Sequence, residues 1–67
     1  MIITDEQISI LKKYIPNVDE LVARDDLYEL EINLDQAIID HGMDDKYRLT
    51  REGVMLQKLY DDIYYAN

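Results

Sequence analysis

The chain has 67 residues, no cysteine, and 15 acidic against 7 basic side chains, which gives a formal net charge of -8. Because nucleic-acid affinity rests largely on Lys and Arg displacing condensed counterions, such a surface disfavours direct binding of DNA or RNA. A chain this short forms at most one domain, residues 1–67, and it has no thiols to staple the fold through disulfides or zinc. No stretch approaches the ~20 apolar residues of a membrane span, and the first residues do not resemble a signal peptide, so we expect a cytoplasmic protein.

Apolar residues make up 48% of the chain and recur with a helical period, which predicts an all-helical fold. Thr4 lies three residues before Gln7, the spacing of a capping box, and predicts the start of a first helix. This helix is expected to continue to Pro16, whose ring and missing N–H stop it. Asn17 is the predicted cap of a short second helix, with Glu20 at the capping-box position. The apolar face of the first helix consists of Ile8, Leu11, Tyr14 and Ile15.

A third helix is predicted from Asp25 or Asp26 to His41, because acidic residues suit the positive end of a helix dipole and Gly42 is a suitable stop. Its main apolar group consists of Leu27, Leu30, Leu34, Ala37, Ile38 and His41, and a second group beside it of Tyr28, Ile32 and Ile39. A helix that is apolar over so much of its circumference is usually central, so we expect more than one neighbouring helix to touch it.

Residues 42–50 interrupt the helical pattern, and Thr50 is predicted to cap a last helix. Gly53 weakens the first turn of that helix by up to ~1 kcal/mol relative to Ala, and Lys58 can pair with Asp62 four residues on. The apolar face of this helix consists of Met55, Leu56, Leu59, Tyr60 and Ile63. The sequence thus predicts a small four-helix bundle. Because the core is small, self-association of the bundle is an open alternative.

The residue inventory predicts neither an enzyme nor a cofactor. Ser9 is the only serine and has no base beside it in the pattern, and the chain has no glycine-rich phosphate loop. His41 is the only imidazole and has Asp40, Asp44 and Asp45 close in sequence. Zinc usually recruits two or more His or Cys ligands, so we interpret His41 as a helix-end histidine and predict no metal.

Tyrosines provide the most suggestive pattern, because all 6 aromatic residues are Tyr. Tyr60, Tyr64 and Tyr65 lie in the last predicted helix, beside Asp61 and Asp62. A tyrosine ring packs while its hydroxyl stays hydrated, which suits both the edge of a core and a protein interface. We predict that these five residues bind a partner; the alternative is that the rings cover an undersized core.

Two stretches resemble known families. The segment Tyr47–Leu56 resembles the exit from the wing of winged-helix regulators, which implies a DNA-binding fold. However, the segment that would be the recognition helix carries Glu29, Glu31, Asp35 and Asp40 and no Lys or Arg, so it is poorly suited to a DNA groove. The C-terminal quarter is similar to the C-termini of short uncharacterised proteins of Gram-positive phages and prophages, through Leu49-Thr50, Gly53, Leu56-Gln57, Leu59-Tyr60-Asp61-Asp62-Ile63-Tyr64 and Asn67. This second resemblance implies an accessory protein of a mobile element, without catalytic residues.

These patterns together predict a non-enzymatic domain that binds another protein or a second copy of itself. The alternative is an acidic mimic, whose carboxylates would occupy the nucleic-acid site of a host protein. A mimic needs its acids on one continuous face. The adjacent Asp pairs of this chain fall at the ends of, or between, different predicted helices, which suggests that its charge is dispersed.

Overall fold

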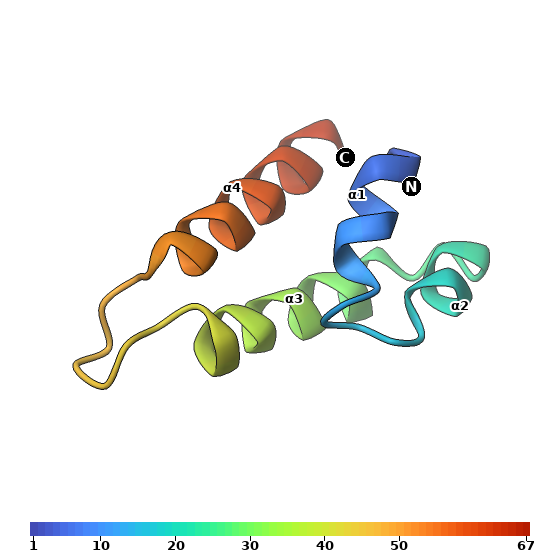
Figure 1. The fold of residues 1–67 in the computed structure, drawn as a ribbon. Helices are drawn as coiled ribbons and strands as arrows, with labels where there is room; N and C mark the ends of the chain where they lie inside the picture. The colour runs from blue at the N-terminus through green and yellow to red at the C-terminus, as the bar shows by residue number, and fades with distance from the viewer.

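The computed structural model describes all 67 residues and contains four helices, α1 (Asp5–Leu11), α2 (Val18–Ala23), α3 (Leu27–His41) and α4 (Arg51–Ala66). The predicted all-helical class is confirmed. The two long helices, α3 and α4, run side by side in opposite directions, and the short helices α1 and α2 pack on one side of this pair (Figure 1). None of the helices combines the length and the apolar character that crossing a bilayer requires.

Helix α1 begins at the predicted capping box but ends before the proline. The Thr4 hydroxyl accepts the N–H of Gln7 at 3.0 Å, and the Gln7 side chain accepts the N–H of Thr4 at 2.9 Å. Leu11 is the last helical residue, and the Tyr14 N–H then donates to the Leu11 carbonyl in a tighter turn. The expected continuation to the proline is therefore wrong. Ile15 precedes that proline and is disfavoured in helical conformation, yet it is still buried in the core.

Helix α2 forms where expected, but its predicted cap does not. Asn17 has φ -96° and ψ 23°, which is not the extended conformation that brings an N-cap side chain over the helix amides. Its side chain makes no capping hydrogen bond, so this prediction is wrong. Glu20, the other predicted member of the box, instead pairs with Arg24 at 3.4 Å.

A tight turn leads from α2 into α3. The N–H of Asp25 bonds to the Val22 carbonyl and the N–H of Asp26 to the Leu21 carbonyl, which is the hydrogen-bond pattern of a Schellman motif. Asp25 occupies the left-handed position of this motif, with φ 55°. Asp26 then caps α3, because its side chain accepts the N–H of Glu29 at 3.2 Å. The predicted start of the third helix is confirmed.

The end of α3 and the start of α4 are also confirmed, at His41 and after Thr50, whose hydroxyl accepts the N–H of Gly53 at 3.2 Å. Gly42 has φ -104°, so a left-handed backbone is not the reason for this glycine. Glycine is required here because the neighbouring backbone leaves no room for a side chain. A Cβ on Gly42 would lie 2.6 Å from the Gly53 Cα, and one on Gly53 would lie 1.9 Å from the Gly42 carbonyl oxygen.

The connection between α3 and α4 is a short hairpin-like turn. Met43 and Leu49 form an isolated antiparallel bridge at its base. The Asp44 carboxylate accepts the N–H of Arg48 at 3.0 Å, and the Arg48 side chain donates to it at 3.1 Å. Tyr47 is left-handed, with φ 61°, at the position where a hairpin of this kind usually has glycine.

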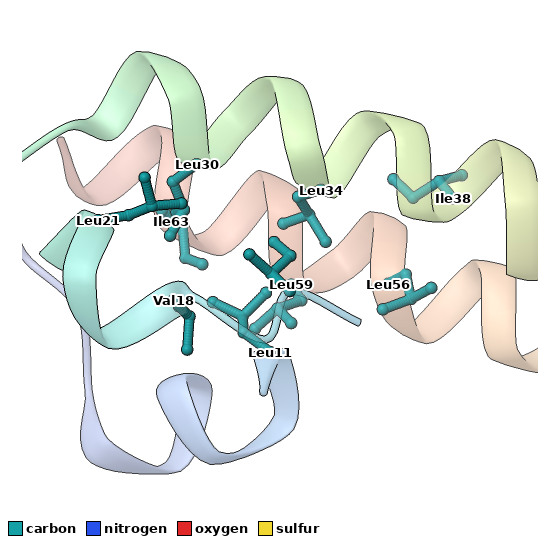
Figure 2. Close-up of a cluster of buried hydrophobic side chains, with 10 residues drawn as sticks. Leu11, Val18, Leu21, Leu30, Leu34, Ile38, Leu56, Leu59 and Ile63 are labelled. Carbon is teal, nitrogen blue, oxygen red and sulfur yellow. The ribbon is translucent and has the colours of Figure 1, made fainter. Parts of the chain in front are cut away.

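One apolar core joins all four helices (Figure 2). Its buried members are Leu11, Ile15, Val18, Leu21, Leu30, Leu34, Ile38, Leu56, Leu59 and Ile63. Leu34 lies at the middle of α3 and is 1% exposed, as expected for the centre of the main apolar group. His41 was expected in the same group, but it is exposed because it lies at the end of the helix.

The two ends of the described chain are tied together. The Asn67 side-chain oxygen accepts the N–H of Ile2 at 2.7 Å, and its amide donates to the Ile2 carbonyl at 3.0 Å. The same amide donates to the Ile63 carbonyl at 2.7 Å, inside α4. The N and C labels accordingly lie close together in Figure 1.

Candidate functional site

The second apolar group of α3 is uncovered. Tyr28, Ile32 and Ile39 are 75%, 45% and 51% exposed, and their spacing places them on one side of the helix. Helix α3 does contact both α2 and α4, as expected of a central helix. Helices α1 and α2 have only 7 and 6 residues, and they pack against the side of α3 that carries Leu30 and Leu34 (Figure 2), which leaves this group exposed.

Two tyrosines of α4 extend this surface. The rings of Tyr60 and Tyr64 stack, with centroids 6.2 Å apart and planes 9° from parallel. Tyr60 is partly buried and Tyr64 is 53% exposed. Stacked rings lose little conformational freedom on binding, which favours their use as contact residues. We call this surface the open face; it consists of Tyr28, Glu31, Ile32, Asp35 and Ile39 of α3 with Tyr60 and Tyr64 of α4.

A shallow pocket of about 140 Å³ lies in the open face between α3 and α4. It is lined by Tyr28, Glu31, Ile32, Asp35 and Tyr60. Burial of its hydroxyl raises the pKa of Tyr60, and the negative charges of Glu31 and Asp35 raise it further. The pocket therefore combines aromatic and apolar walls with a negative potential.

The charge of α3 is not neutralised within the protein. This helix contains Glu29, Glu31, Asp35 and Asp40 and no Lys or Arg. None of the six ion pairs of the structure involves a residue of α3. On α4, the ammonium group of Lys58 pairs with Asp62 at 3.0 Å, as predicted.

The structure brings only part of the predicted tyrosine site together. Tyr60 and Tyr64 stack, and Asp61 lies near enough to Tyr60 to contribute to its raised pKa, after burial and the α3 carboxylates. Tyr65 is 82% exposed and touches Tyr64 edge-on, with ring centroids 5.3 Å apart. Asp62 forms an ion pair with Lys58 and lies about 100° around the helix from Asp61.

Four residues of the pocket were not predicted as site residues: Tyr28, Glu31, Ile32 and Asp35. The signal for them was present in the second apolar group of α3 and the two acids spaced between its members. The first two helices are too short to cover both apolar groups of α3, so one of the two groups stays exposed.

A second pocket, of about 160 Å³, is polar and lies on the other side of α3, lined in part by Tyr14, Asp40 and His41. The His41 ring lies 5.5 Å from that of Tyr14. The Tyr14 hydroxyl donates to Glu52 at 2.5 Å, and this bond, together with burial, raises the pKa of Tyr14. No three His, Asp or Glu side chains gather where they could hold a metal ion.

Comparison of the chain with protein-family models, with characterised proteins and with solved structures finds no match. The open face and the polar pocket are therefore interpreted from their own residues. Of the two, the open face has the larger exposed apolar surface.

Proposed function

We propose that this protein is a non-enzymatic binding domain that uses the open face to hold another protein. One observation carries the proposal: the large side chains of Tyr28, Ile32 and Ile39 on α3 and of Tyr64 on α4 are exposed, and Tyr60, which stacks on Tyr64, lines a pocket with Tyr28 and Ile32. Burying apolar area is worth roughly 25 cal/mol per Å², so another molecule gains by covering this face. Grouped exposed apolar residues with a polar rim are typical of protein interfaces.

The composition of the face supports a protein as the ligand. Tyrosine is enriched at interfaces and among the residues that dominate binding energy, and Tyr60 and Tyr64 are already held in place by stacking. A pair of antiparallel helices presents a groove into which an amphipathic helix can lay its apolar face. The resemblance of the C-terminal quarter to phage and prophage proteins supports an accessory role in a mobile element.

We also propose that the four helices act as one small bundle, and that another protein, rather than a second copy, is the occupant of the open face. Each copy carries a net charge of -8. A symmetric dimer through this face would bring Glu31 and Asp35 of both copies together, and like charges facing each other oppose association.

The second candidate function is the acidic nucleic-acid mimic. It is favoured by the four acids of α3, a helix that contains no Lys or Arg. Their positions favour it less, because the helical repeat places Glu29 and Asp40 on one side of α3 and Glu31 and Asp35 on another. A mimic would use all four carboxylates, whereas the protein-binding proposal needs only the pair in the open face.

Affinity capture from the native cell, with matched variants, tests the proposal. Ile32→Ser removes an apolar side chain from the open face, and Ile2→Ser removes an exposed isoleucine from elsewhere, which is 65% exposed against 45% for Ile32. We expect one protein to be retained by the wild type and by Ile2→Ser and lost by Ile32→Ser. Equal capture by all three would contradict a role for the open face. A sedimentation-detected dimer that Ile32→Ser dissociates would identify a second copy as the occupant.

A further inference from the structure

We propose that the pocket between Tyr28 and Tyr60 receives a Lys or Arg side chain from the bound protein. This inference rests on the proposed protein-binding function and specifies the chemistry of the partner. The pocket, called the cation pocket below, is lined by Tyr28, Glu31, Ile32, Asp35 and Tyr60.

Unpaired carboxylates provide the first argument. Glu31 and Asp35 lie one helical turn apart on the wall of the pocket, and neither takes part in an ion pair. Helix α3 has no Lys or Arg, its His41 does not line the pocket, and Lys58 of α4 is held by Asp62. No cation within the protein compensates this charge, so a cation supplied by the partner would gain attraction without displacing an existing pair.

The walls of the pocket provide the second argument. Lysine and arginine bind well where a charged head meets carboxylates and aromatic faces, while the methylene stem lies along an apolar surface. The cation pocket offers these in one place, with carboxylates on α3, the rings of Tyr28 and Tyr60, and the side chain of Ile32. Its volume of about 140 Å³ leaves room for a single planar or compact head group.

The potential at Tyr60 agrees with this assignment. Burial is the first cause of its raised pKa, and the charges of Glu31 and Asp35 are the next. The pocket therefore places negative charge beside a partly buried tyrosine. An acidic or phosphorylated segment would be repelled there, and a purely apolar segment would bury two carboxylates without a counterion, which is costly.

Selection of a random peptide library on the immobilised protein, followed by titration calorimetry of the synthesised binders, tests the inference. Each binder is titrated against the wild type, against Glu31→Gln/Asp35→Asn, and against Glu29→Gln/Asp40→Asn. The last is a matched control, since it removes the same charge from the same helix but outside the cation pocket. Circular dichroism checks that every variant keeps its helices.

We expect the binders to be enriched in Lys or Arg. Their affinity should fall about tenfold or more in the pocket variant and less than about twofold in the control. Replacing the critical lysine of a peptide by norleucine, or its arginine by citrulline, should weaken binding to the wild type but add little to the loss in the pocket variant.

Two other outcomes are distinguishable. Binders that are lost with Ile32→Ser, yet bind the pocket variant and the control equally, would overturn the cation pocket and leave the protein-binding function standing. A library that yields no binder, or only binders that tolerate Ile32→Ser, would overturn both proposals.

Discussion

Gly42 and Gly53, the only two glycines of the chain, pack backbone against backbone where α3 ends and α4 begins. Neither has a positive φ. Each residue is a glycine because the backbone of the other glycine occupies the space that a Cβ would need. This contact fixes the closed end of the α3/α4 pair and sets how near the two helices approach.

The glycine contact reverses the usual effect of an alanine in a helix. Helix propensity alone would make Gly53→Ala stabilising by up to ~1 kcal/mol. The added methyl group would meet the Gly42 carbonyl oxygen at 1.9 Å, and overpacking of this kind costs ~1 to 3 kcal/mol. We expect urea denaturation followed by circular dichroism to show a net loss of stability. A higher denaturation midpoint for Gly53→Ala would show that the helices are not in this contact.

Leu34→Ala should be among the most damaging core substitutions. Leu34 is 1% exposed at the middle of α3, and truncation of such a leucine costs ~2 to 5 kcal/mol, comparable with the whole stability of a small domain. The matched control is Ile39→Ala on the same helix, where the side chain is 51% exposed and the cost should be much smaller. Equal denaturation midpoints for the two variants would contradict the placement of the core.

Tyr47→Gly should stabilise the protein. Tyr47 holds a left-handed conformation, with φ 61°, which costs a bulky residue about 1 kcal/mol or more and costs glycine little. The same substitution at Tyr28, within α3, should destabilise by roughly 0.5 kcal/mol because glycine is a poorer helix former than tyrosine. Thermal denaturation of the two variants should therefore shift in opposite directions. A lower melting temperature for Tyr47→Gly would mean that its ring makes a stabilising contact.

Acid sensitivity should depend on Asp44. Its pKa lies below the ordinary value, chiefly because the backbone N–H of Arg48 donates to its carboxylate. Because the pKa of Asp44 is lower in the folded state than in the unfolded state, the stability that its carboxylate contributes is fully present above about pH 4. This stability is lost as the pH falls through the pKa of the folded state. Asp44→Asn should therefore reduce stability at neutral pH and flatten its decline in acid, measured by denaturation across pH. Asp45→Asn, at the next residue, should change the profile less.

Binding energy should be concentrated on the stacked tyrosines. Once a partner or a selected peptide is available, Tyr64→Ala should lower the affinity for it at least several-fold while leaving the circular dichroism spectrum nearly unchanged. Asp61→Asn/Asp62→Asn should have the smaller effect, because Asp62 is paired within the protein. The nucleic-acid mimic requires the reverse: a large effect of the aspartates, little effect of Tyr64, and steep weakening with salt. Calorimetry at low and moderate salt separates the two.

Local signals in the sequence were sufficient for most helix boundaries. The caps at Thr4, Asp26 and Thr50 each involve residues three apart, so spacing alone predicts them. Asn17 follows a turn whose backbone holds it out of the extended conformation, and no spacing reveals that. Helix α1 ends earlier than expected, at Leu11, where a separate turn over residues 12–14 begins.

The features that the sequence could not predict depend on how the helices pack against one another. Gly53 has a poor helical propensity when viewed alone, and only the position of Gly42 explains it. Likewise, Tyr28 and Ile32 have the same spacing as core residues. They are exposed because α1 and α2 pack against the side of α3 that carries Leu30 and Leu34 (Figure 2), and which side is covered is a property of the assembled chain.

The clamp that Asn67 places on Ile2 makes the chain nearly a closed ring. A short linker could therefore join residue 67 to residue 1, and new ends could be opened in the hairpin-like turn around Tyr47, without moving any helix. Such a circular permutant would cut the covalent link between α3 and α4 but keep the contact between Gly42 and Gly53. Its folding would show whether that contact holds the two long helices together by itself or depends on the turn that connects them.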